Sequence, residues 1–222
     1  MKAMILAAGL GKRLRPLTLT MPKPLVPVLG KPLIVYHIEN LAKAGFDDIV
    51  INHCWLGEQL LCALGDGARW GVNLSYCAET EPLETGGGVL QALPRLTEHQ
   101  DTFVVVNGDV YTDYPMKNLR RPLPGQAHLV LVDNPSFKTT GDFACSDGFV
   151  SEQGSPLHTF SGISVLSKAL FAHCQPGRFS LIPLLRRAMT HQQVSGELYK
   201  GHWVDVGTLE RLQQLEKQLS TG

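Results

Sequence analysis

The sequence contains few cysteines, and none of them forms a metal or disulfide motif. Its five cysteines are an odd number among 222 residues, are widely spaced, and include no Cys-x-x-Cys pair: Cys54, Cys62, Cys77, Cys145 and Cys174. This pattern argues against a disulfide framework and against a zinc site. The eight histidines form no spaced cluster either. We therefore expect reduced, mostly buried thiols.

The sequence also lacks an excess of either charge and any long apolar run. Twenty basic and twenty acidic residues cancel, which gives no electrostatic reason to expect a nucleic acid or an anionic membrane as partner. No apolar run approaches the ~20 residues that span a bilayer, and the first residues do not read as a signal peptide. We predict a cytoplasmic protein with neither kind of partner.

Apolar runs alternate with segments of helical period, a pattern typical of an α/β domain. We expect strands near residues 2–8, 48–52, 72–78, 102–106 and 127–133, and helices near 32–44, 57–65, 86–96 and 115–120. Further on we expect a hairpin over 143–150 with an Asp-Gly turn, a strand over 160–166, and helices over 167–174, 180–190 and 208–219. The pattern predicts a single domain over residues 1–222, a Rossmann-like three-layer α/β/α sandwich with a mixed, mostly parallel sheet.

A glycine-rich loop follows the first apolar run. Gly9 and Gly11 allow the backbone to approach a polyphosphate closely, and Lys12, Arg13 and Arg15 follow at once. The spacing matches neither the dinucleotide-binding glycine pattern nor the P-loop. We interpret the loop as a nucleotide-phosphate site of another kind.

Two aspartates follow predicted strands. Asp109 ends the run Phe103-Val104-Val105-Val106-Asn107-Gly108-Asp109, and Asp205 lies in Trp203-Val204-Asp205-Val206-Gly207-Thr208. Each could simply cap a turn or a helix. Together with a triphosphate, however, two carboxylates suit Mg²⁺, which takes few protein oxygens and completes its shell with phosphate and water.

These motifs resemble those of the sugar-1-phosphate nucleotidyltransferases. The family signature Gly-x-Gly-x-Arg-x-x-Pro-Leu-Thr is present at residues 9–18, and Pro-Lys-Pro-Leu follows at 22–25. The resemblance implies that Arg13 and Lys23 are catalytic and that Asp109 and Asp205 hold Mg²⁺. It also implies transfer of a nucleotidyl group from a nucleoside triphosphate to a sugar-1-phosphate.

The resemblance places base and ribose recognition between residues 77 and 88. Thr85 and Gly86 match the family loop, whereas Glu84 stands where relatives carry glycine. Glu79 occupies a position that often contacts the base. Its carboxylate would accept the N–H of uracil, thymine or guanine but face an acceptor on cytosine, which argues against CTP. The resemblance implies UTP as donor, with these nucleotide-binding residues: Gly9, Gly11, Lys12, Arg13, Lys23, Glu79, Thr85 and Gly86. Two alternatives stay open: Glu79 as a solvated loop acid, and glycines that serve only helix packing.

The acceptor sugar is expected to contact Asn107, Gly141 and Ser161, which match family segments. The Glu-Lys-Pro motif of many relatives is absent, so Glu152 is predicted to replace its glutamate. No lysine follows Glu152, which leaves open what holds the acceptor phosphate.

Within the family, the short chain looks most like the bacterial uridylyltransferases of cell-wall recycling, whose acceptor is N-acetylmuramate α-1-phosphate. Alternatives are mannose-1-phosphate guanylyl transfer, glucose-1-phosphate thymidylyl transfer, or a non-catalytic sensor of nucleotide sugars. Because the resemblance ends soon after Asp205, without the elements through which relatives often associate, we expect a monomer.

Overall fold

The computed structural model describes residues 1–220, and its centre is a nine-stranded sheet. In spatial order the strands are β5 (Asn73–Ala78), β4 (Asp48–His53), β1 (Ala3–Leu6), β6 (Thr102–Asn107), β11 (Leu157–Ser167), β8 (Ala127–Val132), β12 (Val194–Tyr199), β10 (Phe149–Ser151) and β9 (Phe143–Ser146). Two short pairs lie outside it, β2 (Pro27–Val28) with β3 (Lys31–Pro32) and β7 (Val110–Thr112) with β13 (Trp203–Asp205).

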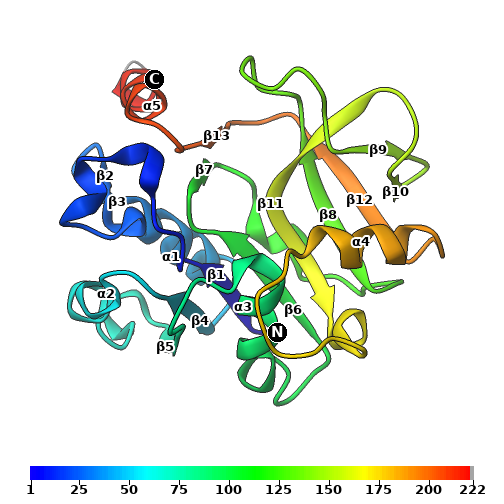
Figure 1. Ribbon diagram of the computed structural model, residues 1–222, viewed down its shortest axis with the longest axis horizontal. Coiled ribbons are helices and arrows are strands. Elements are labelled where there is room, and N and C mark those ends of the chain that lie inside the picture. Colours follow the sequence, from blue (N-terminus) through cyan, green and yellow to red (C-terminus); the bar gives the residue numbers. More distant parts are fainter. Residues whose placement is uncertain (221–222) are drawn as a thin grey trace.

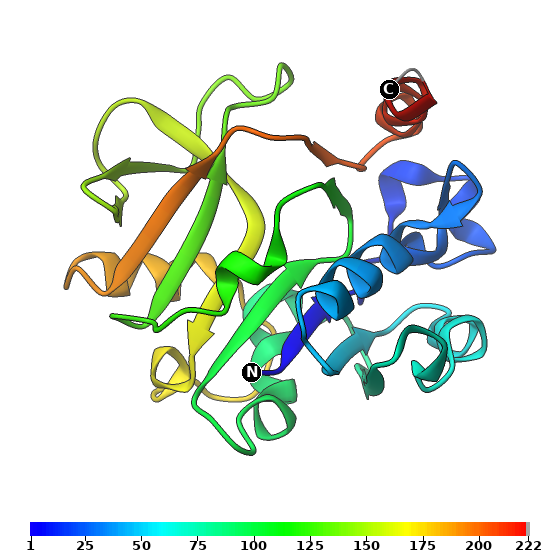
Figure 2. The same cartoon turned by 180° about the vertical axis from the view of Figure 1, so that it is seen from behind.

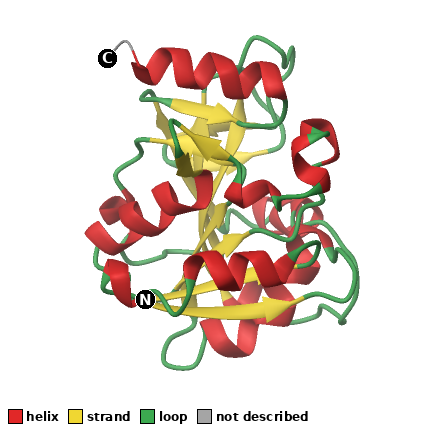
Figure 3. Cartoon of the chain, turned by 90° about the vertical axis from the view of Figure 1, so that its left-hand side faces the viewer, coloured by secondary structure: helices red, strands yellow, loops and turns green. Residues whose placement is uncertain are grey.

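The first half of the sheet, β5-β4-β1-β6, is parallel. Its central strands β1 and β6 are apolar on both faces because helices cover both, as Figure 3 shows from the side, whereas polar residues of the edge strand β5 are exposed. In β6, Val104 and Val106 pack beneath α1 (Leu33–Lys43) and α2 (Gly57–Leu64), whereas Phe103 and Val105 face α3 (Glu84–Leu96) and α4 (Ile182–Met189). The predicted strands of this half and these helices are confirmed with small shifts at their ends.

The second half of the sheet corrects the expectation of a mostly parallel arrangement. β11 runs antiparallel to both β6 and β8, and it also pairs antiparallel with β9. The extra pairing closes β11, β8, β12, β10 and β9 into a barrel in which only β8 and β12 are parallel. The fold is thus α/β with a mixed sheet, and the sandwich description holds for its first half. The single domain over residues 1–222 stays a prediction.

The structure also decides the predictions for the shorter elements. The Asp-Gly hairpin is confirmed as β9 and β10, with Asp147 and Gly148 both at positive φ. The predicted helices at 115–120 and 167–174 are single 3₁₀ turns, η5 (Met116–Leu119) and η6 (Lys168–Phe171). β12 is a strand that the apolar pattern missed. Within residues 1–220, no helix has the length and apolar character needed to cross a bilayer.

The last helix of the chain packs against a segment from its first quarter. Figures 1 and 2 show α5 (Leu209–Ser220, red) beside the β2–β3 hairpin (blue). Leu212 and Leu215 of α5 pack there against Val26 and Val28 in a third apolar cluster. This packing fixes the segment from β13 to α5, which carries Asp205.

His37 of α1 is completely buried behind Asp109. Its Nε2 lies 2.7 Å from the Val110 carbonyl, which makes it the protonated nitrogen, and its Nδ1 has no partner among the described residues. Burial lowers the pKa of His37 from 6.5 to about 4, only partly offset by the Val110 carbonyl and the charge of Asp109. The imidazole is therefore neutral in the folded protein at neutral pH.

We predict that His37 makes the fold acid-sensitive. Below pH 6.5 the unfolded chain takes up a proton that the folded chain does not, so stability is lost as the pH falls toward 4. The full loss is about 3 kcal/mol. Urea unfolding of wild type and His37→Gln from about pH 7 to about 4.5 measures it. The variant should lose less stability over this range, and equal pH slopes would contradict the prediction.

Candidate active site

Two adjoining pockets lie where β1 and β6 end. The first, of about 290 Å³, is bordered by the loop after β1, by Lys23, and by Glu79 and Thr85. The second, of about 200 Å³, lies toward the barrel. Asn107 and Asp109 border both. Since β4 lies on one side of β1 and β6 on the other, the pockets occupy the switch point of the sheet, where α/β proteins bind ligands.

The loop after β1 is held by a chain of buried hydrogen bonds. The Ala7 N–H donates to Asn52 Oδ1 (2.7 Å), and Asn52 Nδ2 donates to Glu79 Oε1 (2.6 Å). The other oxygen of Glu79 accepts the Leu83 N–H at 2.9 Å. Glu79 is only 5% exposed, so the alternative of a solvated loop acid is wrong. Its carboxylate ties the glycine-rich loop to the start of α3.

The predicted phosphate-binding residues divide into two groups. Gly9 borders the first pocket, and Gly11 has a left-handed backbone (φ 59°) that packs against Thr18 and Lys23. Lys12 and Arg13 are exposed and border neither pocket within the described chain. Gly9 and Lys23 therefore border the pocket and Gly11 packs beside Lys23, whereas the side chains of Lys12 and Arg13 lie outside the pocket walls.

Lys23 is the buried cation of the site. It follows Pro22 in the 3₁₀ turn η3 (Lys23–Leu25), and its Nζ lies 2.7 Å from Asp109 Oδ2. Its side chain is 9% exposed against 40% for that of Asp109. A buried ammonium requires such a partner, so this ion pair fixes both groups at the border of the pockets.

Asp205 lies beside Asp109 because β13 pairs with β7. Asp205 is in register with Val110, and the Val206 N–H donates to the Asp109 carbonyl at 2.9 Å. Arg211 Nη1 donates to Asp205 Oδ2 at 2.6 Å, whereas Asp205 Oδ1 is buried and has no hydrogen-bond partner among the described residues. A buried carboxylate oxygen without a partner is unusual and requires an explanation.

The guanidinium of Arg13 and the carboxylate of Asp205 both lie close to Gly207. A Cβ at Gly207 would lie 2.9 Å from Asp205 Oδ1 and 3.0 Å from Arg13 Nη2. Only glycine permits this approach, and it brings the guanidinium to the edge of the carboxylate site. Sequence reasoning did not identify Arg211, although it lies six residues after Asp205 on the predicted helix.

Backbone N–H groups at the start of α3 already have partners within the protein. The N–H groups of Gly86 and Gly87 both donate to the Phe179 carbonyl, at 3.0 and 3.1 Å. Thr85 borders the first pocket, and its Oγ1 accepts the Leu181 N–H at 3.0 Å. Helix packing thus occupies the glycine amides, while a nucleotide contact for Thr85 and Gly86 stays a prediction.

Glu84 keeps the backbone path that a glycine would take. Its φ is 62°, in the left-handed region, and its carboxylate forms an exposed ion pair with Arg178 at 2.9 Å. The replacement of glycine noted in the sequence is therefore accommodated as backbone strain at this position.

The second pocket contains part of the predicted acceptor site. Asn107 and Ser161 border it, but the Ser161 hydroxyl is buried, donates to the Val130 carbonyl and accepts the Ile163 N–H.

Two residues expected at the acceptor site lie outside the second pocket. Gly141 packs its Cα on the backbone of Leu157. Glu152 also lies outside both pockets and pairs with Arg186 of α4 at 3.1 Å. Sequence reasoning missed Lys138, which borders the second pocket.

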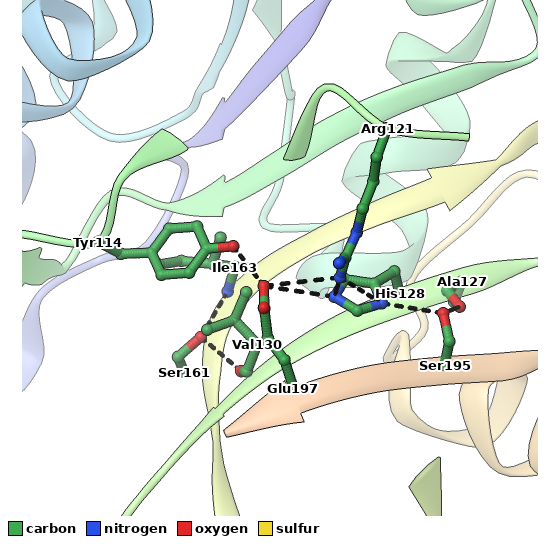
Figure 4. Close-up of polar contacts among 9 residues, drawn as sticks. All are labelled: Tyr114, Arg121, Ala127, His128, Val130, Ser161, Ile163, Ser195 and Glu197. Atoms are coloured by element: carbon green, nitrogen blue, oxygen red, sulfur yellow. Dashed lines mark hydrogen bonds and ion pairs between the residues drawn. The ribbon is translucent and has the colours of Figure 1, made fainter. Parts of the chain in front are cut away.

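A buried polar network holds the segment after β7 against the barrel (Figure 4). Tyr114 donates to Glu197 of β12 at 2.5 Å, and Arg121 and His128 lie on the other side of this carboxylate. Hydrogen bonds from His128 and Tyr114, with the charge of Arg121, lower the pKa of Glu197 to about 2 despite its burial. The Glu197 carboxylate therefore stays ionised beside the charge of Arg121, and its hydrogen bond with Tyr114 holds the segment after β7.

Comparisons with known proteins agree with this geometry. Residues 2–128 match the family described as nucleotidyl transferase. An N-acetylmuramate alpha-1-phosphate uridylyltransferase of Neisseria meningitidis serogroup B is 47% identical over 97% of both chains. A mannose-1-phosphate guanylyltransferase catalytic subunit beta of Xenopus tropicalis is 31% identical over 93% of this chain, which spans 61% of its length.

Solved structures show the same fold at low identity. A putative glucose-1-phosphate thymidylyltransferase from Bacillus anthracis matches with a TM-score of 0.84 at 20% identity, over 98% of this chain and 94% of the other. HddC from Yersinia pseudotuberculosis, complexed with GMP-PN, matches with a TM-score of 0.79 at 22% identity, over 98% and 99%.

We predict that the strain at Glu84 is measurable against a matched variant. Glu84→Gly and Glu84→Ala both remove the ion pair with Arg178, but only glycine relieves the left-handed backbone. Glu84→Gly should be the more stable by roughly 0.5 to 1 kcal/mol, after allowing for the freer unfolded chain. Urea unfolding of both variants measures the difference. A more stable alanine variant would show that residue 84 is not strained.

Proposed function

Because this chain belongs to the nucleotidyl transferase family, we propose that it transfers the uridylyl group of UTP to N-acetylmuramate α-1-phosphate. The products would be a UDP-sugar and pyrophosphate, in a step of cell-wall recycling. The observation that carries the proposal is the 47% identity to the uridylyltransferase across nearly the whole chain. The two pockets meeting at Asp109 support it, because the reaction joins two substrates at one point.

In this proposal the acceptor phosphate attacks the α-phosphate of UTP in line, and pyrophosphate leaves. A phosphate monoester has a second pKa near ~6, so the nucleophile needs no general base at neutral pH. The protein has to hold the acceptor phosphate next to the α-phosphate of UTP and to stabilise the negative charge that accumulates between them. Lys23 is placed for this at the border of the pockets. Arg13, at the edge of Asp205, suits the leaving pyrophosphate through its forked donors.

Asp109 and Asp205 would hold Mg²⁺, and the donor set fits the ion. Both border the second pocket, and Asp205 Oδ1 is a buried carboxylate oxygen without a hydrogen-bond partner among the described residues. No group of three or more His, Cys, Asp or Glu among residues 1–220 is placed around a common metal position. A metal on these two carboxylates would take its other ligands from phosphate and water, as Mg²⁺ does. Bound there, it would neutralise charge on the phosphates.

Glu79 is proposed to read the uracil. Its buried carboxylate borders the first pocket while it accepts from Asn52 and Leu83. Each carboxylate oxygen can accept more than one hydrogen bond, so these contacts orient the group and leave acceptor capacity for the base. The protein is further proposed to act as a cytoplasmic monomer.

The experiment that tests the activity is a pyrophosphate-release screen. It combines the four ribonucleotides and dTTP with N-acetylmuramate, N-acetylglucosamine, mannose and glucose 1-phosphates. UTP with N-acetylmuramate α-1-phosphate should give the highest kcat/KM. A higher value for GTP with mannose 1-phosphate, or for dTTP with glucose 1-phosphate, would assign the alternative activity instead.

We predict that both aspartates are needed for turnover and that activity requires a divalent metal. Asp109→Asn and Asp205→Asn should each lower kcat by at least ~100-fold, the scale for removing a group that stabilises developing charge. Steady-state kinetics with added Mg²⁺ or with EDTA measures both effects. Asp147→Asn, in the β9–β10 turn and outside both pockets, is the matched control. Near-normal kcat in either site variant would overturn the metal assignment.

We predict that Glu79 discriminates UTP from CTP. Cytosine N3 is an acceptor and would face the carboxylate, a mismatch worth roughly 1 to 3 kcal/mol in a desolvated pocket. Glu79→Gln should narrow the ratio of the two kcat/KM values, since an amide also donates. The substitution also alters the hydrogen bond between Glu79 and Asn52. Any loss of kcat/KM that this causes for both nucleotides cancels in the ratio of UTP to CTP. An unchanged ratio would mean that Glu79 does not read the base.

A further inference from the structure

Lys138 is a cation fixed in the second pocket. Its Nζ lies 2.5 Å from Asp142 Oδ2, and the same oxygen accepts the Phe160 N–H at 2.9 Å. The Lys138 side chain is 30% exposed, so it is neither free in solvent nor sealed. The close packing of Gly141 on Leu157 and the hydrogen bond from Asp142 N–H to the His158 carbonyl (2.7 Å) set the position of Asp142. The ammonium is therefore held in place.

The position of Lys138 separates it from the point of transfer. Lys23, Asn107 and Asp109 border the first pocket, and the latter two also border the second. Lys138 borders the second alone and is the one lysine or arginine among the described residues that line it. The reacting phosphate of the acceptor must reach the shared border. Lys138 is thus available to an anionic group elsewhere on the acceptor.

We propose that Lys138 is a specificity-determining residue that binds the carboxylate of the acceptor sugar. The inference rests on the proposed function, because N-acetylmuramate is N-acetylglucosamine with an added lactyl ether that ends in a carboxylate. An ammonium has three N–H donors, and Asp142 accepts one of them here. Pro135 and Phe137 border the same pocket and offer apolar surface to the lactyl methyl group.

The test compares two acceptors that differ only in the lactyl ether. With UTP as donor, kcat/KM is measured for N-acetylmuramate α-1-phosphate and for N-acetylglucosamine α-1-phosphate in wild type and Lys138→Met. An acceptor too slow to assay is measured instead by its inhibition constant. The variant should lose on the order of 10- to 100-fold for the first acceptor, the scale of one charged hydrogen bond, and little for the second. KM for UTP should not change.

Three further variants keep the test independent of folding. Lys168→Met, at an exposed lysine of η6 outside both pockets, should match wild type for both acceptors. Lys138→Arg should recover part of the preference because it keeps the charge. Asp142→Asn keeps an acceptor for the Phe160 N–H and removes the charge that anchors Lys138, so it should weaken the preference less than Lys138→Met.

The outcomes are distinguishable. Equal losses for both acceptors would show that Lys138 holds the shared phosphate, and no loss for either would show that it contacts no acceptor; each result overturns the inference. Failure of the wild-type protein to use N-acetylmuramate α-1-phosphate with UTP would overturn the proposed function instead, and it is seen before any variant is made.

Discussion

The pairing of β7 with β13 places the carboxylates of Asp109 and Asp205 at one site. The surrounding structure has to offset the repulsion between these two negative charges. Like charges in a partly buried place are unfavourable unless cations compensate them. Lys23 pairs with Asp109 and Arg211 pairs with Asp205, at 2.7 and 2.6 Å. Lys23 comes from the segment that follows the glycine-rich loop, and Arg211 comes from α5 near the end of the chain. The packing of α5 on the β2–β3 hairpin is thus required for charge balance at the site as well as for stability.

Most polar groups around these carboxylates have hydrogen-bond partners. Asn52 and Glu79 close a chain of hydrogen bonds between the glycine-rich loop and α3, and Tyr114 and Glu197 fasten the segment after β7 to the barrel. Two buried polar atoms of the region, His37 Nδ1 and Asp205 Oδ1, have no partner among residues 1–220. Burying an unpaired carboxylate oxygen is costly, and the proposed metal would relieve that cost at Asp205.

The sequence was sufficient for the parts of the molecule set by local pattern. β1 and β6 were predicted because both of their faces are buried, and the position of Asp109 just past the carboxyl end of β6 followed from the same apolar run. The barrel was not predictable, because its closure depends on pairing between β9 and β11 rather than on local periodicity. β12 was missed since polar Ser195 and Glu197 alternate with its apolar residues, and Glu152 was expected at the acceptor pocket although β10 carries it to Arg186. Lys138 and Arg211 belong to no motif, and only the folded chain brings them to the site.

The division of the sheet also divides recognition between the two pockets. The walls of the first pocket come from the parallel half, where the loop after β1 and the entry to α3 are tied together by Asn52 and Glu79. The second pocket is lined by the loop after β8, by β11 and by β13. The pockets share only Asn107 and Asp109. Because residues that do not touch one another contribute nearly independently, substitutions in the barrel loops can reshape the second pocket while the glycine-rich loop and the shared border at Asn107 and Asp109 stay as they are.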